Sequence, residues 1–188
     1  MSLRKTIEVV ARLKANKVIA NYAIAGAVAA LNYVQPTLTE DLDILVSIDG
    51  FASGPSGLLL LTPIEDALAR MGYTQRTDVG YLVEDWPVQF LPVGSALDEE
   101  ALEQAVELNV APAGEAPLMA RSLRAEHVVA TAAKLGRTKD LLRIETFLNQ
   151  KAVDLSRLKS VLERHNLMND WRVLLMKVGI KDPLAGVE

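Results

Sequence analysis

A short acidic pattern at residues 41–46, Asp-Leu-Asp-Ile-Leu-Val, constrains this chain most tightly. Alternate side chains of a strand share one face, so Asp41 and Asp43 would point the same way, about 6–7 Å apart along the backbone. The apolar residues that follow predict a central, buried strand. Neighbouring carboxylates repel each other, and a divalent cation between them relieves that repulsion. The alternative is a pair of solvated charges at an exposed strand start.

Just upstream, residues 22–33 have the pattern of a short strand, a glycine turn and a helix. Gly26 would make the turn, and small residues follow it at the start of the helix. The N-terminus of such a helix can hold a phosphate group, because its backbone N–H groups have no partner within the helix. An ordinary strand-to-helix turn is the alternative. A phosphate site beside a metal-binding acidic pair would suit chemistry on nucleotides.

The composition limits the class of protein. The chain has 188 residues, half of them hydrophobic, which suffices for one α/β domain with an appendage or two very small domains. A net charge of -4 argues against nonspecific coating of nucleic acid but allows a local basic site. Without cysteine, disulfides and thiolate metal sites are excluded. The absence of a signal-peptide core and of a long apolar stretch predicts a cytoplasmic protein without a membrane contact.

Hydrophobic periodicity and turn residues define the expected elements of the first part of the chain. A helix is predicted over 3–15, and strands over 22–25 and 42–48. The helix between these strands should end at 35–36, because a residue before proline avoids helical angles. Thr62 should cap a helix that has Pro63 at its first position and reaches Met71. The remaining expectations are strands at 73–76, 81–84 and 88–91, a turn at 85–87, a helix at 98–105 and an edge strand at 106–110.

Beyond a Pro/Gly-rich segment at 111–117, the sequence is helical in period. Helices are predicted over 124–135, 137–149, 155–164 and 168–177, with Gly136 as a C-cap. The expected fold class is α/β (α+β): a mixed sheet with flanking helices, followed by a helical bundle. The expected division is an α/β core at 1–117 and a helical region at 118–188 packed on it.

Two blocks of sequence resemble the nucleotidyltransferase superfamily. Residues 22–30, Tyr-Ala-Ile-Ala-Gly-Ala-Val-Ala-Ala, and residues 39–44, Thr-Glu-Asp-Leu-Asp-Ile, together resemble its glycine-turn and Asp-x-Asp signature. More narrowly, they are similar to the minimal and abortive-infection (AbiEii-like) nucleotidyltransferases. Residues 134–140, Lys-Leu-Gly-Arg-Thr-Lys-Asp, are similar to a Lys…Arg-x-Lys-Asp element that these proteins carry after the sheet. The blocks occur in the family's order and cover 22–48 and 126–148.

The resemblance implies an expected fold, the nucleotidyltransferase fold, and an expected activity. Such enzymes transfer a nucleoside monophosphate from a nucleoside triphosphate (NTP) to an acceptor and release pyrophosphate. Asp41 and Asp43 would be the catalytic ligands of Mg²⁺. The implied triphosphate contacts are Ala25, Gly26, Ala27, Thr39, Arg137 and Lys139. Lys134 would also neutralise phosphate charge, and Asp140 would orient one of the basic residues. The alternative for this second block is a cluster of charges at a helix end.

Two positions depart from the family pattern. Ala25 stands where the family has the first glycine of the turn, so the loop has less conformational freedom. Gln89 stands where active members carry a third carboxylate, and a glutamine can ligate a metal but cannot act as a carboxylate base. Glu84 or Asp85 on the adjoining hairpin could substitute for it. The sequence therefore supports the fold more strongly than the catalysis.

The acceptor and partners follow only from the resemblance. RNA, a protein hydroxyl or a small molecule such as an aminoglycoside would serve as acceptor, and an antitoxin-like protein would be a partner if the chain is a toxin–antitoxin component. Two rival hypotheses remain: a degenerate fold that binds nucleotide or protein without chemistry, and an interaction module built on the C-terminal helices. The loop at 53–57 lacks the Gly-Lys-Ser/Thr ending of a P-loop, which argues against that ATPase type. His127 and His165 lack metal-ligand spacing and are predicted to be structural.

Overall fold

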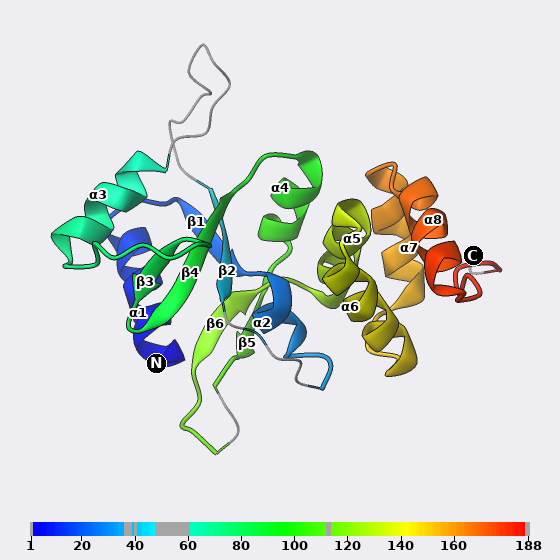
Figure 1. The fold of residues 1–188 in the computed structure, drawn as a ribbon, viewed down its shortest axis with the longest axis horizontal. Helices are drawn as coiled ribbons and strands as arrows, with labels where there is room; N and C mark the ends of the chain where they lie inside the picture. Colours follow the sequence, from blue (N-terminus) through cyan, green and yellow to red (C-terminus); the bar gives the residue numbers. More distant parts are fainter. Residues whose placement is uncertain (1, 36–38, 40, 48–60, 112–113, 187–188) are drawn as a thin grey trace, which may run out of the picture.

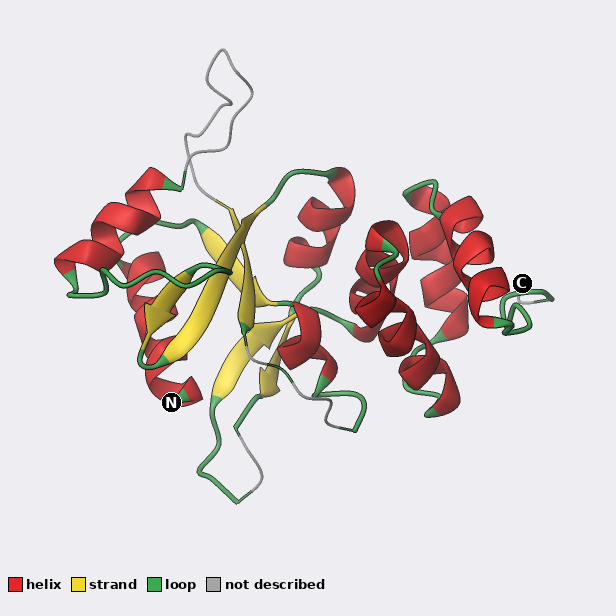
Figure 2. Ribbon diagram, viewed as in Figure 1, coloured by secondary structure: helices red, strands yellow, loops and turns green. Residues whose placement is uncertain are grey.

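A mixed six-stranded sheet organises the first two thirds of the protein, in the order β3-β4-β2-β1-β6-β5 (Figure 2). The computed structural model describes residues 2–35, 39, 41–47, 61–111 and 114–186. The strands are β1 (Asn21–Ile24), β2 (Leu42–Ser47), β3 (Tyr81–Val83), β4 (Trp86–Pro92), β5 (Val106–Asn109) and β6 (Met119–Ser122). The helices are α1 (Leu3–Ala15), α2 (Gly26–Ala30), α3 (Thr62–Arg70), α4 (Ala96–Glu103), α5 (Ala125–Leu135), α6 (Thr138–Asn149), α7 (Leu155–Arg164) and α8 (Met168–Val178).

The topology places β2 in the interior of the sheet. It pairs antiparallel with β1 on one side and parallel with β4 on the other. The hairpins β3–β4 and β5–β6 complete the two edges, and β6 lies parallel to β1. In Figure 1, α3 lies to the left of the sheet, α1 lies behind β3 and β4, and α4 and the helices α5–α8 lie to the right.

The core explains why the chain folds this way. Leu42, Ile44 and Val46, which share one face of β2, are fully buried, and Leu45 on the opposite face is 5% exposed, so both faces of this strand are covered. Asp43 interrupts this run at a half-buried position. In the C-terminal helices, Trp171 and Phe147 have no exposed surface. The sheet and the helices therefore form a well-packed molecule with one acidic side chain set into its central strand.

The predicted fold class is confirmed: the protein has a mixed sheet, flanking helices and a set of C-terminal helices. α1 and α7 have the predicted bounds, and β1, β2, α5, α6 and α8 lie within one or two residues of theirs. β5 is an edge strand, as expected. Gly136 caps α5 with a left-handed φ of 62°, which glycine adopts without steric cost. Among the described residues, no helix is both long and apolar enough to cross a membrane.

Several local predictions around the β3–β4 hairpin are wrong. Residues 73–76 form no strand, and Arg76 makes only an isolated bridge with Tyr81. The turn consists of Glu84 and Asp85, whose φ angles of 52° and 63° suit a two-residue hairpin turn. Residues 86 and 87, expected in that turn, belong to β4 instead. Because the turn has only two residues, β4 begins at Trp86, two residues earlier than the sequence predicted.

Three helix boundaries also differ. α2 ends at Ala30, well before Gln35. Thr62 is the first residue of α3 and not its cap; Leu61 precedes it without a side-chain hydrogen bond. α4 begins earlier than residue 98, because the Ser95 hydroxyl caps it by accepting from the Asp98 N–H.

β6 was not predicted, and it continues the sheet past residue 117. A division at 117 would cut this strand from its partners β1 and β5. We keep the division into a sheet-containing core and a helical region as a proposal, with the boundary after Ser122. Residue 48 and the loop at 53–57 lie outside the described residues.

Candidate active site

Asp41 and Asp43 line one cavity of about 580 Å³, here called the acidic cavity. Asp43 is the second residue of β2, and Asp41 immediately precedes the strand. The Thr39 hydroxyl donates to the Asp41 carbonyl at 3.0 Å and to its Oδ1 at 3.3 Å, which fixes the carboxylate. The lining residues are Ala27, Ala30, Val34, Thr39, Asp41, Asp43, Thr77, Asp78, Val79, Pro87, Lys139, Leu142, Arg143 and Thr146.

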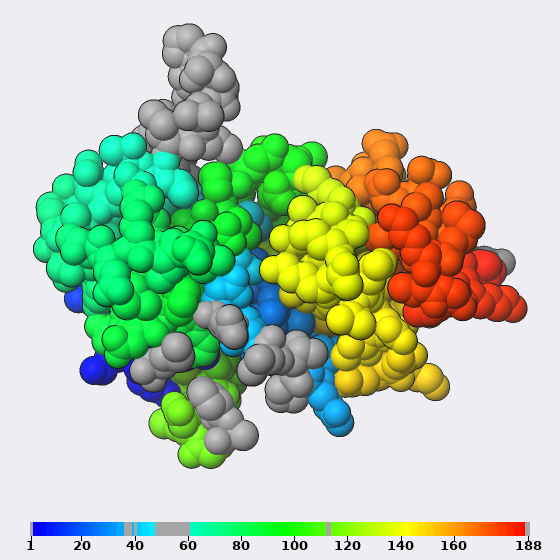
Figure 3. All heavy atoms as spheres, viewed as in Figure 1, coloured from blue at the N-terminus to red at the C-terminus, as the bar shows by residue number. Residues whose placement is uncertain are grey.

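The acidic cavity lies where two parts of the molecule meet. In Figure 3, atoms of the blue and cyan segments that contain α2 and β2 are recessed between the green segments of the core and the yellow helices α5 and α6. Asp41 and Asp43 therefore both face this cleft.

The electrostatics of Asp43 reflect crowding by like charge. Burial raises the pKa of its carboxyl above the usual value, and the nearby Asp41 raises it further. Lys139, Arg143 and Arg137 act in the opposite direction. Two carboxylates held close together in a half-buried setting attract a cation, since a cation would compensate both charges.

Gly26 is required because Asp43 lies against it. It is the first residue of α2 and has a φ of +59°. A Cβ built on it would lie 1.9 Å from the Asp43 Oδ2, well inside any allowed contact. The Ala25 N–H also donates to the Asp43 carbonyl at 2.8 Å. The glycine turn and the acidic strand are therefore in direct contact through both the backbone and the side chain of Asp43.

A second cavity, of about 330 Å³, adjoins the first and is here called the basic cavity. It shares Asp43 and Lys139 with the acidic cavity. Lys134 and Arg137 add two further positive charges, and the Lys134 Nζ donates to the Ser95 Oγ at 2.8 Å. The lining residues are Ala25, Gly26, Asp43, Leu45, Gln89, Leu91, Pro92, Asp98, Leu123, Val128, Thr131, Lys134, Leu135, Arg137 and Lys139. The fold therefore brings the two sequence blocks together.

Asp140 lies behind these cations and lines neither cavity. It is fully buried and accepts from the Arg137 Nε at 2.7 Å and from the Arg143 Nη1 at 3.3 Å. The Arg137 backbone N–H also donates to it, at 3.2 Å. The effect of Asp140 on a ligand would therefore pass through the two arginines that it orients.

Arg143 is a site residue that the sequence reasoning missed. It lines the acidic cavity, and burial lowers the pKa of its guanidinium. Its spacing of three residues from Asp140 on α6 was a usable signal, because side chains at that spacing share a helix face. Apart from Asp140, the residues that the resemblance implied for the site, Ala27 and Thr39 included, all line one or both cavities.

Gln89 stands directly beside Asp43 on the neighbouring strand, β4. The suggested substitutes for a third carboxylate do not lie there. The Glu84 carboxylate accepts from the Tyr73 hydroxyl at 2.5 Å, and both Glu84 and Asp85 line a separate cavity with Tyr73. Within the described part of the chain, no three His, Asp or Glu side chains are grouped to hold a metal. A cation at the acidic pair would need further oxygen ligands from water or a phosphate.

No family model matches the sequence, and no curated protein matches it. Among solved structures, the protein is similar to the antibiotic-resistance factor ANT(2'')-Ia, with a TM-score of 0.47 and 14% identity over 93% of this chain and 95% of the other. Identity this low assigns neither an activity nor a residue role to this chain.

Proposed function

We propose that the protein is a magnesium-dependent nucleotidyltransferase that moves a nucleoside monophosphate from an NTP to an acceptor. One observation carries the proposal: Asp43 and Lys139 lie where the acidic and basic cavities join. A triphosphate needs positive charge along its length, and the acceptor needs an approach to the reacting phosphorus. Two adjoining cavities of unlike charge meet both needs.

The side chains of this protein would act mainly by positioning and by balancing charge. Lys134, Arg137 and Lys139 would neutralise the triphosphate in the basic cavity, and the acceptor would enter through the acidic cavity. Asp41 and Asp43 would hold Mg²⁺, which supplies further charge neutralisation at the phosphate. The donor set fits such an ion, since both carboxylates face the same cavity.

A second candidate is a degenerate member of the same fold that binds nucleotide without transferring it. Gln89 favours this candidate. It lies beside Asp43, and its amide cannot act as a base that removes a proton from an acceptor hydroxyl. The two candidates share the binding site and differ in chemistry alone.

The test is a transfer assay with each of the four NTPs labelled at the α-phosphate, with Mg²⁺ and three acceptor pools: total RNA, total protein and an aminoglycoside mixture. We expect the wild type to label one pool, and Asp43→Asn to reduce labelling at least 100-fold. Asp66→Asn on the exposed face of α3 is the matched control and should label like the wild type. If the wild type labels no pool but Gln89→Glu does, the protein belongs to the degenerate class.

A further inference from the structure

We propose that a third cavity, at the opposite end of α5 from Lys134, binds a phosphate group. This arginine cavity has a volume of about 520 Å³ and shares no lining residue with the acidic or basic cavity. Its lining residues are Gln104, Arg124, Glu126, His127, Ser156, Arg157, Ser160, Val161 and Arg164. Arg124 and Lys134 are ten residues apart, about 15 Å along the helix axis. The inference does not depend on the proposed function.

The charge of the lining favours an anion. Arg124, Arg157 and Arg164 line the cavity with one carboxylate, Glu126. Glu100 balances the charge of Arg164, so Arg124 and Arg157 leave one positive charge in excess over Glu126. Glu126 is already engaged, because its Oε1 accepts from the Asp154 N–H at 3.3 Å. His127 adds no charge at neutral pH, since burial lowers its pKa. This excess of positive charge favours an anion, and the planar donor fork of a guanidinium suits the oxygens of a phosphate.

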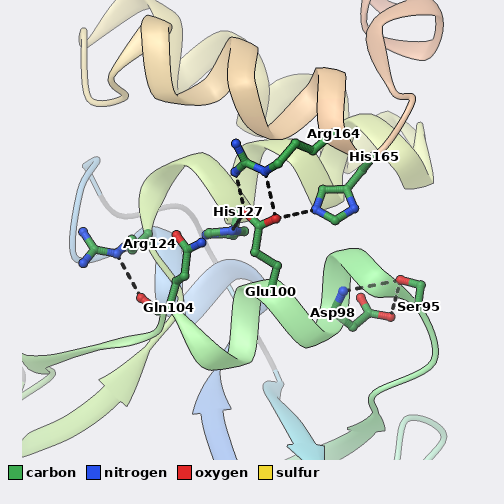
Figure 4. A network of polar contacts seen from close by, with 8 residues as sticks. All are labelled: Ser95, Asp98, Glu100, Gln104, Arg124, His127, Arg164 and His165. Carbon is green, nitrogen blue, oxygen red and sulfur yellow. Dashed lines mark hydrogen bonds and ion pairs between the residues drawn. The ribbon is translucent and has the colours of Figure 1, made fainter.

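The arginines keep donors available for a ligand. Arg124 uses its Nε to donate to the Gln104 carbonyl at 2.9 Å, and its terminal nitrogens donate to no group in the described ranges. Arg157 is exposed and contacts Asp154 only at 3.6 Å. Arg164 is held by Glu100, through an Nη2 to Oε1 bond of 2.6 Å and an Nε to Oε2 bond of 3.1 Å (Figure 4). One arginine is therefore fixed in place, and two can turn toward an anion.

Neutral donors complete the lining. Ser156 and Ser160 lie one turn apart on α7, and neither hydroxyl has a hydrogen-bond partner among the described residues. His127 is 1% exposed, and its neutral ring donates through Nε2 to Glu100, so its Nδ1 is a buried acceptor without a partner in the part of the chain that is described. Native proteins seldom leave a buried polar atom unsatisfied without a ligand or water nearby, and a water or a protonated phosphate oxygen could donate to this nitrogen. The arginine and serine donors of the wall suit the other oxygens of a phosphate.

The network behind the cavity gives it rigidity. Figure 4 shows Glu100 extending from α4 toward His127, Arg164 and His165. Its Oε1 lies 3.1 Å from the His127 Nε2, and its Oε2 lies 2.8 Å from the His165 Nε2. Glu100 does not line the cavity, and its charge is paired with that of Arg164. The site is thus preorganised by contacts between α4, α5 and the end of α7.

The test is isothermal titration of the full chain with inorganic phosphate and, separately, with glycerol 2-phosphate, in EDTA at pH 7.5 and constant ionic strength. We expect at least one probe to bind, with at least tenfold weaker affinity in Arg124→Gln and in Arg157→Gln. Arg172→Gln on the exposed face of α8 is the matched control and should bind like the wild type. If both probes bind, the site recognises the phosphate group of either ligand. If only inorganic phosphate binds, the ligand of the site is the free phosphate ion.

Three results would overturn the inference: no binding of either probe, equal binding by the wild type and both arginine variants, or equal weakening in Arg172→Gln. Asp43→Asn separates this site from the proposed active site. If Asp43→Asn abolishes phosphate binding, the phosphate lies in the basic cavity and the inference is wrong. Failure of nucleotide transfer leaves the result unaffected, because the titration contains no Mg²⁺ and no nucleotide.

Discussion

At the residue scale, the contact between Gly26 and Asp43 defines the candidate site. The glycine has both a left-handed φ of +59° and a carboxylate oxygen in the space that a Cβ would fill. The first property alone makes other residues strained, and the second makes them clash. Gly72 has only the first property: its φ is +91°, and nothing lies within 4 Å of its Cβ position.

This pair of glycines gives the first prediction. Gly26→Ala should destabilise the protein by about 2–4 kcal/mol, from backbone strain together with displacement of Asp43. Gly72→Ala should cost only about 1–2 kcal/mol, from strain alone. Urea unfolding followed by circular dichroism measures both. Equal losses in the two variants would mean that the Asp43 contact does not restrict residue 26.

Much of the site could be predicted at this scale, because its residues lie in short local patterns. The spacing of Asp41 and Asp43 predicts their common face. The resemblance singled out Gln89, which the structure shows paired with Asp43. Arg143 was missed although its spacing of three residues from Asp140 was a usable local signal. Glu100 was missed for a physical reason, because its histidine partners lie 27 and more residues away and only the folded chain brings them near.

At the element scale, the start of α6 serves two purposes. Arg137 is its N-cap residue, and its backbone N–H and Nε both donate to Asp140 in the first turn. The sequence left open whether residues 134–140 are a helix-end cluster or a set of phosphate-contacting cations. The structure shows a helix-end cluster whose cations also line the cavities. The two interpretations are therefore compatible.

The second prediction concerns this helix start. Asp140→Ala should destabilise the protein by about 3 kcal/mol, because Arg143 would be left largely buried without its counter-ion. Asp154→Ala is the control: it caps α7 and contacts the exposed Arg157, so its loss should cost only about 1 kcal/mol. Chemical denaturation of the two variants would show the difference. A loss below 1 kcal/mol for Asp140→Ala would contradict a structural role for the buried carboxylate.

The helices could be predicted where a regular hydrophobic periodicity extends over many residues. α1 and α7 carry many periodic apolar positions, and both were placed correctly. β6 has four residues, of which only Ala120 and Ser122 are buried, and it follows a Pro/Gly-rich loop that suggested a boundary. Residues 73–76 contain β-favouring side chains but lack a partner strand beyond the Arg76–Tyr81 bridge. Strand pairing is a tertiary property, so short strands carry little local signal.

At the scale of the whole molecule, Glu100 connects the sheet-containing core to the C-terminal helices. It extends from α4, which packs beside the sheet, to His127 on α5 and to Arg164 and His165 at the end of α7. These hydrogen bonds, that of Arg164 foremost, lower the pKa of Glu100 to about 2. The carboxylate is therefore favoured in the folded state over the unfolded state.

The third prediction is the pH dependence that follows. A carboxyl whose pKa is lowered on folding stabilises the protein above its unfolded pKa, so this contribution is complete above about pH 4.5 and disappears as the pH falls toward 2. We expect a loss on the order of 1–3 kcal/mol over this range, since Arg164 is partly exposed. Glu100→Gln should flatten the pH profile of the unfolding free energy, and Glu99→Gln on the exposed face of α4 should not. Parallel profiles for all three proteins would contradict the linkage.

The account as a whole rests on the acidic pair as a cation site next to a triphosphate site. Titration of the full chain with a nonhydrolysable NTP, with and without Mg²⁺, tests this most directly, with Asp43→Asn as the variant and Asp66→Asn as the control. We predict that the wild type and Asp66→Asn bind the nucleotide at least tenfold more tightly with Mg²⁺ than without it, and that Asp43→Asn loses this gain. Equal affinities for the wild type and Asp43→Asn in the presence of Mg²⁺ would contradict the account.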